Sequence, residues 1–398
     1  MRSIFKREGP YYADQLWRPH IVRRFSVSGE HLETPAELQI VSELWNVRAQ
    51  VPYLIHMPEK DRLVMLLQAE HQPAVIVSDD RGATWSHPKF ANEALCITPE
   101  RFYFGIGLAY LGRGTAIFTS AEGTCNGTDV WFSHDYGETW NDKKPLPRAF
   151  DGKYCHQWDP FLVDRNPTTG STERIMLAGY TYTTDMSHTL GFVRFSDDLG
   201  DTWSADIVVP EWDRKNEIAL VRAANGDIVA APRLDPSDED LDKYDHYTGF
   251  GISVSKDNGY SWSETQPIYD TGRHHTSTVL LPNGALVMSY VVRMGYPDTA
   301  EGLPQFGVEA VVSRDNGQSW DLEHRYVLHR WNAGRKERIP WHRSVQQTSS
   351  VLLPDGSVYT AFGTYYRSEP AENNLIRPLD VGLVRWRPLE SDSKEVRA

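Results

Sequence analysis

One eight-residue motif occurs five times in the chain and constrains its fold more than any other feature. Its first copy is Ser-Asp-Asp-Arg-Gly-Ala-Thr-Trp at residues 78–85, and the Asp, Gly and Trp at its third, fifth and eighth positions recur in every copy. The other copies occupy residues 133–140, 196–203, 255–262 and 313–320. An Asp side chain accepts backbone N–H groups within a turn, Gly adopts a positive φ, and Trp covers a strand pair. We therefore interpret the motif as a structural hairpin turn and expect no catalytic role for it.

A second pattern precedes each copy and consists of an apolar strand, a turn and another apolar strand. Its clearest forms cover residues 276–284 and 348–356, and weaker forms start near Val51, Phe104, Trp158 and Glu217. The tryptophans of the eight-residue motif lie 55, 63, 59 and 58 residues apart, which gives a repeat of about 59 residues. Six such units fit into the chain after residue 47. A period of this size with four short strands per unit is typical of a β-propeller.

The last unit lacks one strand. Residues 381–386 have the pattern of its third strand, and no copy of the eight-residue motif follows them. The N-terminal run at residues 20–27 can supply the missing strand and close the ring, so that no sheet edge stays open. We therefore predict an all-β, six-bladed β-propeller that forms one domain over residues 1–398, with residues 1–47 as an N-terminal segment that includes the closing strand.

Composition and charge exclude several classes of protein. Acidic residues outnumber Lys and Arg by 54 to 41, so the formal net charge is −13, and we expect no binding of nucleic acid. No stretch approaches about 18 uninterrupted apolar residues, and the first residues lack an apolar signal core, so we expect no membrane partner and leave a cytoplasmic or a secreted location open. Three cysteines are too few for a disulfide scaffold, and no ligand set has metal-site spacing. We expect neither a metal nor a cofactor.

The eight-residue motif resembles the Asp-box, or BNR repeat, of the sialidase (neuraminidase) superfamily, and the six units are similar to the six-bladed propeller of that superfamily. The resemblance implies a carbohydrate-active enzyme whose ligand sits over the central channel, near the starts of the innermost strands. Asp-boxes also occur in lyases, exo-arabinanases and non-enzymatic propellers, so the functional positions have to be compared one at a time.

Several positions match the residues with which sialidases hold their substrate. Residues 48–53 are similar to the Arg-Ile-Pro motif whose Arg binds the substrate carboxylate, which makes Arg48 a candidate. The acid of the following loop has no clear counterpart, although Glu70 could replace it. Residues 216–227 together with Arg233 are similar to the segment that supplies a buried Glu and a second Arg, so the resemblance implies these roles for Glu217 and Arg233. A third Arg could be Arg293.

The sialidase nucleophile is not matched. Where the family places its Tyr, this chain has Gln347, and Tyr365 belongs to the next loop. Exo-arabinanases of the same superfamily instead use two carboxylates at the starts of the third and fourth blades. The sequence Trp158-Asp159-Pro160 places Asp159 at the first position, where those enzymes have Glu, and Glu217 stands at the second. One protonated and one ionised carboxyl are what glycoside hydrolysis requires.

The remaining candidates are basic and aromatic residues expected on the same rim. A ring of arginines would form a local positive basin for a carboxylate or sulfate, which implies an anionic sugar; its members are Arg48, Arg101, Arg233, Arg293 and Arg367. His156, His274 and His275 fall on this rim together with several tyrosines. A His and a Tyr that face the C5 proton of a uronic acid could carry out β-elimination.

We therefore predict a glycoside hydrolase of the sialidase-like type that removes an anionic sugar from an oligosaccharide or polysaccharide. Glu217 is the expected nucleophile or base, and Asp159 or Glu70 the proton donor. Two alternatives stay open: a polysaccharide lyase that uses His275 or His156 with a rim Tyr such as Tyr365, and a glycan-binding propeller without catalysis.

Overall fold

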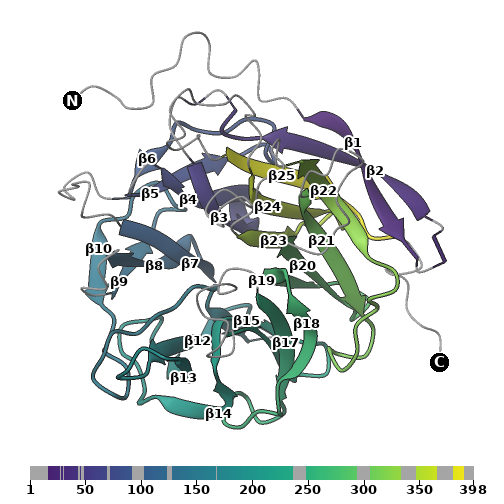
Figure 1. Cartoon of the computed structure of the whole chain (residues 1–398). Coiled ribbons are helices and arrows are strands. Elements are labelled where there is room, and N and C mark those ends of the chain that lie inside the picture. The colour runs from purple at the N-terminus through teal and green to yellow at the C-terminus, as the bar shows by residue number, and fades with distance from the viewer. Residues whose placement is uncertain are drawn as a thin grey trace, which may run out of the picture.

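The computed structural model describes residues 17–26, 28–29, 31–43, 45, 49–69, 72–91, 103–122, 128–166, 168–235, 248–293, 305–332, 347–364 and 380–389. In these residues the chain forms an all-β structure in which sheets are arranged around a common axis (Figure 1). The described part contains one short 3-10 helix, Pro58–Lys60, and no helix that could cross a membrane.

Four of the sheets have four antiparallel strands each. The first contains β3 (Ala49–Met57), β4 (Arg62–Ala69), β5 (Gln72–Ser78) and β6 (Lys89–Phe90). The second contains β7 (Tyr103–Gly112), β8 (Thr115–Glu122), β9 (Thr128–Ser133) and β10 (Asp142–Pro145). The third contains β11 (Leu162–Arg165), β12 (Thr172–Tyr182), β13 (Thr189–Ser196) and β14 (Ile207–Asp213). The fourth contains β15 (Lys215–Arg222), β16 (Ile228–Leu234), β17 (Thr248–Ser255) and β18 (Gln266–Thr271).

The fifth sheet has nine strands. Its first half contains β19 (Arg273–Leu280), β20 (Leu286–Val292), β21 (Gln305–Ser313) and β22 (Tyr326–Asn332). It continues through β1 (Arg18–Phe25) and β2 (His31–Ile40) to β25 (Asp380–Trp386), β24 (Val358–Thr364) and β23 (Thr348–Leu352). The strands expected to form two separate blades are therefore joined, because β1 pairs with both β2 and β22.

The expected closing strand was wrong in detail. Residues 20–27 were expected to supply the strand next to residues 381–386, but residues 20–25 belong to β1, and it is β2 that pairs with β25. The burial of the two strands gives the reason: β2 supplies Ala36, Leu38 and Ile40 to the interior, whereas in β1 only Val22 is fully buried. The N-terminus does complete the last unit, through the second strand of a hairpin rather than the first.

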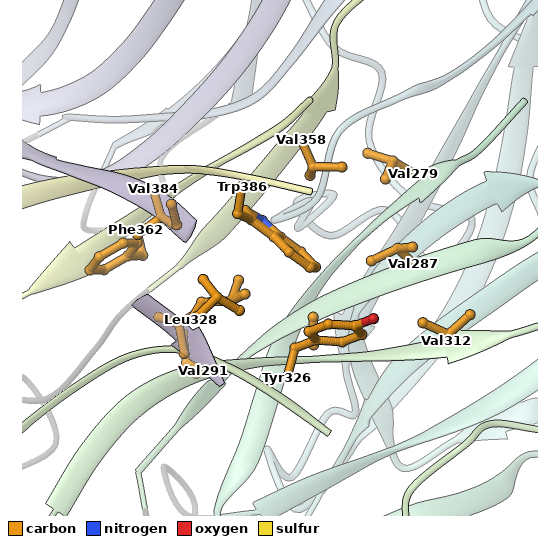
Figure 2. Packing of buried hydrophobic residues seen from close by; sticks show 14 of the residues in the cluster. Val279, Val287, Val291, Val312, Tyr326, Leu328, Val358, Phe362, Val384 and Trp386 are labelled. Atoms are coloured by element: carbon orange, nitrogen blue, oxygen red, sulfur yellow. The ribbon is translucent and has the colours of Figure 1, made fainter. Parts of the chain in front are cut away.

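The innermost strands form a closed ring around the axis. β3 contacts β7, the contacts continue through β11, β15 and β19 to β23, and β23 contacts β3. The hydrophobic core lies between neighbouring sheets. Figure 2 shows a layer between the two halves of the nine-stranded sheet, in which Trp386 and Phe362 belong to one cluster with Tyr326, Val287 and Val312 of the first half. This ring brings residues from distant parts of the sequence to one end of the axis.

The repeated motif is a hydrogen-bonded turn, as predicted. In the first copy Asp80 accepts hydrogen bonds from the Thr84 backbone and hydroxyl at 2.8 and 2.6 Å, and the Gly82 N–H donates to the Ser78 hydroxyl at 2.7 Å. Arg81 and Gly82 both have positive φ. The other four copies repeat these contacts around Asp135, Asp198, Asp257 and Asp315. The carboxylates are used within the turns, which confirms the structural interpretation.

Candidate active site

Backbone bulges shape the start of four innermost strands. In β15 the register shifts between Asn216 and Ala219, and in β19 it shifts between His274 and Ser277. The residue inside each bulge has a left-handed backbone, with φ of 45° at Glu217 and 50° at His275. β3 and β7 have the same bulge, at Val51 and at Gly107. A non-glycine residue in this region is strained by about 1–3 kcal/mol, and such strain gathers at functional sites.

The two bulges on neighbouring strands place Glu217 beside His275. The Nδ1 atom of His275 lies 3.2 Å from Oε2 of Glu217. The other carboxylate oxygen, Oε1, accepts a hydrogen bond of 2.9 Å from Nη1 of Arg233 on β16. Arg233 is oriented in turn by Thr248, whose hydroxyl accepts a hydrogen bond from its Nε at 3.0 Å. Glu217 is thus a largely buried carboxylate with a hydrogen bond to Arg233 on one oxygen and His275 within ion-pair distance of the other.

Asp159 is the second carboxyl of this region. It lies in the loop that leads from His156 into β11, is 2% exposed, and its backbone oxygen accepts a hydrogen bond from the Gln157 side chain at 2.8 Å. Burial raises the pKa of Asp159 well above its usual value, and the charge of Glu217 raises it further, whereas the Gln347 amide acts in the opposite direction. The two carboxyls therefore differ in environment: Asp159 favours its protonated form, and Glu217 forms an ion pair.

The loop that carries Asp159 is held by Tyr53, which the sequence comparison did not single out. Its hydroxyl donates a hydrogen bond of 2.5 Å to the backbone oxygen of Trp158, and the residue is fully buried. Burial and the charges of Asp159 and Glu217 raise the pKa of Tyr53. The signal in the sequence was its place in residues 48–53, the stretch that resembles a sialidase motif, but the bulge at Val51 changes which residues face the site.

Trp158 and Gln347 connect the third unit to the last one. The indole N–H of Trp158 donates to Oε1 of Gln347 at 2.8 Å, and the amide of Gln347 donates to the Thr348 carbonyl at 3.1 Å. The Trp158 ring also lies 6.0 Å from the ring of His275. Gln347 is fully buried. The residue at the position of the sialidase Tyr thus fixes a tryptophan in this chain.

An aromatic cluster lies close enough to Glu217 for its charge to act on Tyr180. The ring of His156 stacks on Tyr180 at 5.3 Å and meets Tyr182 edge-on at 5.2 Å. Burial lowers the pKa of His156, which favours its neutral form. Burial raises the pKa of Tyr180, with a further contribution from the Glu217 charge. The neighbouring His274 is fully buried, with its ring 4.5 Å from that of His275.

The structure thus brings together Asp159, Glu217, Arg233, His275, Trp158 and Gln347. Arg293 is buried at the end of β20, where its backbone N–H donates to the Gly272 carbonyl at 2.9 Å. The other candidates, Arg48, Glu70, Arg101, Tyr365 and Arg367, lie outside the described residues. Among the described residues no three His, Cys, Asp or Glu side chains are grouped so that they could hold a metal ion.

Comparisons with known proteins agree with this architecture. The family model of the BNR repeat-like domain matches residues 115–330. No curated protein matches the sequence. Since the family model covers more than half of the chain, the protein belongs to the BNR repeat-like domain family, and the resemblance to sialidases that the motifs indicated is confirmed.

Solved structures show the same fold at low sequence identity. A protein of unknown function from Dyadobacter fermentans is 17% identical with a TM-score of 0.65, and the match covers 92% of this chain and 99% of that one. The Trypanosoma rangeli sialidase is 14% identical with a TM-score of 0.55, over 96% of this chain and 58% of the sialidase. The α-L-arabinofuranosidase of Fusarium graminearum is 12% identical with a TM-score of 0.56, over 88% and 96%. At these identities the three likenesses show the fold of this chain.

Proposed function

We propose that this protein is a glycoside hydrolase that removes an anionic sugar from the end of an oligosaccharide or polysaccharide. In this proposal the whole chain is one domain, and the two halves of the nine-stranded sheet count as two blades, which gives a six-bladed propeller. The six innermost strands that line one ring support this count.

The observation that carries the proposal is the pair of unlike carboxyls. Asp159 is buried in a setting that favours the protonated form, while Glu217 forms an ion pair with Arg233. Two carboxyl groups whose environments push their protonation states apart are the requirement for glycosidic bond hydrolysis.

The proposed reaction uses each carboxyl in one role. Asp159 donates its proton to the oxygen of the leaving group as the bond to the anomeric carbon breaks. Glu217 acts on the opposite face, either as the nucleophile or as the base that activates a water molecule. Arg233 donates a hydrogen bond to one of its oxygens, and His275 lies within ion-pair distance of the other. Glu70, which lies outside the described residues, is the alternative donor.

The substrate class rests on the arginines. Arg48, Arg101, Arg293 and Arg367 are proposed to hold a carboxylate or sulfate group of the sugar, and Arg233 to take part in this positive basin in addition to its pair with Glu217. Trp158, His156 and His274 are proposed to contact the sugar, since aromatic faces pack well against sugar rings.

A polysaccharide lyase is the second candidate function, because His275 and His156 each lie close to an acidic or phenolic group. His275 is 3.2 Å from Glu217, and His156 stacks on Tyr180. In a lyase one of these histidines would remove the C5 proton of a uronic acid, and a rim Tyr would protonate the leaving oxygen. A glycan-binding propeller without catalysis is the remaining alternative.

The test is to incubate the protein with sialosides, uronate oligosaccharides and neutral arabinan fragments, and to determine the product masses. Hydrolysis adds one water to the products, whereas elimination adds none. We expect hydrolysis products that disappear in Glu217→Gln and Asp159→Asn. Unsaturated products that persist in Glu217→Gln would favour the lyase, and bound but intact oligosaccharide would favour the non-catalytic propeller.

A further inference from the structure

A cavity along the axis begins directly beside the candidate site. This axial cavity has a volume of about 220 Å³ and is lined by segments of all six innermost strands or their approaches. Each segment starts one or two residues after a site residue: Pro160 follows Asp159, Thr276 follows His275, and Ala219 lies two residues beyond Glu217. The axial cavity therefore runs along the innermost strands from the residues that directly follow the candidate site.

A wider cavity of about 1110 Å³ adjoins the far end of the axial cavity. The two share Ile55, Tyr110 and Val351 in their linings. The wider cavity, which we call the vestibule, is also lined by residues of the turns that follow the innermost strands, such as Glu59 and Arg113. The described residues thus outline a path from the candidate site to the opposite face of the ring.

The walls of the axial cavity differ in chemistry. β3, β7 and β15 contribute Leu54, Leu108 and Leu220, whereas β19 and β23 contribute the runs at residues 276–278 and 349–350, which contain only Ser and Thr. Some of these hydroxyls join neighbouring strands: Ser349 accepts from the Leu54 N–H at 2.8 Å, for example. Because a hydroxyl has one donor and two acceptor positions, this wall keeps further capacity for hydrogen bonds.

Thr276 identifies a place for a bound molecule on this wall. It is 2% exposed, and within the described residues its hydroxyl has no hydrogen-bond partner. The carboxyl oxygens of Asp159, which directly precedes Pro160 of the cavity lining, also make no hydrogen bond of good geometry to the described residues. A buried polar group without a partner destabilises the fold by about 1–3 kcal/mol, so such groups usually bind ordered water.

We propose that the axial cavity holds a file of ordered water molecules, anchored at the Thr276 hydroxyl, which connects the Asp159 carboxyl with solvent in the vestibule. At about 30 Å³ per molecule in liquid water, the cavity has room for about seven. Through this file Asp159 exchanges its proton with solvent while a sugar covers the other side of the site. The exchange rests on the proposed function, whereas the presence of the water does not.

High-resolution crystal structures of the native protein, with and without xenon under pressure, test the inference. Xenon enters dry apolar cavities, and ordered water excludes it. We expect a continuous row of water peaks, the first within hydrogen-bond distance of Thr276 Oγ1, and no xenon in the axial cavity. A dry cavity that takes up xenon in the native protein would overturn the proposal.

Two variants separate the role of Thr276 from general effects of substitution. Thr276→Val removes the hydroxyl at nearly constant volume and is expected to lose the first water, whereas Thr276→Ser keeps the hydroxyl and is expected to retain it. The same water in Thr276→Val would exclude Thr276 as the anchor. Failure to hydrolyse any sugar, with the water file present, would count against the proposed function and leave this inference standing.

Discussion

Arg233 binds Glu217 although the strand register pairs it with Asn216. The bulge after Asn216 is the reason: it inserts a residue with a left-handed backbone and turns the Glu217 side chain toward the guanidinium. Asn216 instead donates a hydrogen bond to Asp235. A local irregularity in one strand thus creates the ion pair on which the candidate site depends.

Removing Arg233 should destabilise the protein strongly. Arg233→Met leaves the Glu217 carboxylate largely buried without its cation, so we expect the free energy of unfolding to fall by about 3–5 kcal/mol. Urea unfolding measures this. The double variant Arg233→Met with Glu217→Gln, which removes both charges, should recover much of the loss; equal losses in the single and double variants would show that the ion pair is not the cause.

Asp159→Asn should gain stability relative to the native protein as the pH rises. The folded pKa of Asp159 is raised, so the folded state binds its proton at pH values where the unfolded state has released it, and native stability falls as pH rises between the two pKa values. Asn does not titrate. Thermal unfolding from about pH 2 to 8 measures the difference and also covers the range below the unfolded pKa of an Asp, about 3.9.

Asp185→Asn provides the control of opposite sign. Hydrogen bonds from Thr183 and Ser187 lower the pKa of Asp185, so its contribution to stability is present above the unfolded pKa and is lost as pH falls. As the pH rises, the stability of Asp159→Asn relative to the native protein should therefore increase, and the stability of Asp185→Asn relative to the native protein should decrease. The same trend at both positions would contradict the assignment of Asp159.

Tyr53→Phe should destabilise the loop that carries Asp159, while the volume of the side chain stays nearly the same. The Trp158 carbonyl loses its 2.5 Å hydrogen bond in a buried setting, and we expect a loss of about 1–3 kcal/mol in the free energy of unfolding. Because the loop of Asp159 becomes less fixed, kcat should fall more than KM rises. Unchanged stability would mean that the hydroxyl does not hold this loop.

Gly107→Ala should disturb the same loop from the neighbouring strand. At φ of 68°, an added Cβ would lie 2.8 Å from Nε2 of Gln157 and 3.0 Å from the backbone oxygen of Asp159. Gly152 is a matched control, because it has a φ of 79° and no atom within 4 Å of an added Cβ. Gly152→Ala should show the backbone strain alone, about 1 kcal/mol. Gly107→Ala should exceed it in urea unfolding and should also reduce activity.

The sequence predicted the ring and its turns well, because the motif encodes its own contacts. Asp80, Gly82 and Thr84 bond to one another or to Ser78 within a few residues, so their pattern is visible without any knowledge of the rest of the chain. The joined sheet and the order of β1 and β2 depend on pairing between distant strands, which no local pattern specifies.

The candidate site was predictable only in part for the same reason. Asp159 and Glu217 were predicted from the resemblance to enzymes of the sialidase superfamily, and the structure places both near the start of an innermost strand. The role of Tyr53 depends on the bulge at Val51. A register shift of this kind changes which side chains of the strand face each side of the sheet, and the sequence pattern does not reveal it. The partner of Gln347, Trp158, comes from a unit three repeats away.

The pairing of β2 with β25 has a consequence for folding during synthesis of the chain. Ile40 lies opposite Gly382, so a chain emerging from the ribosome can form this pairing only after residues 380–386 have been synthesised. Until then the apolar surface of Val384 and Trp386 has not been synthesised, and its partners Val22 and Ala36 stay exposed to other nascent chains. A circular permutation that places the β1–β2 hairpin directly after β25 would bring the two paired segments next to each other in the sequence.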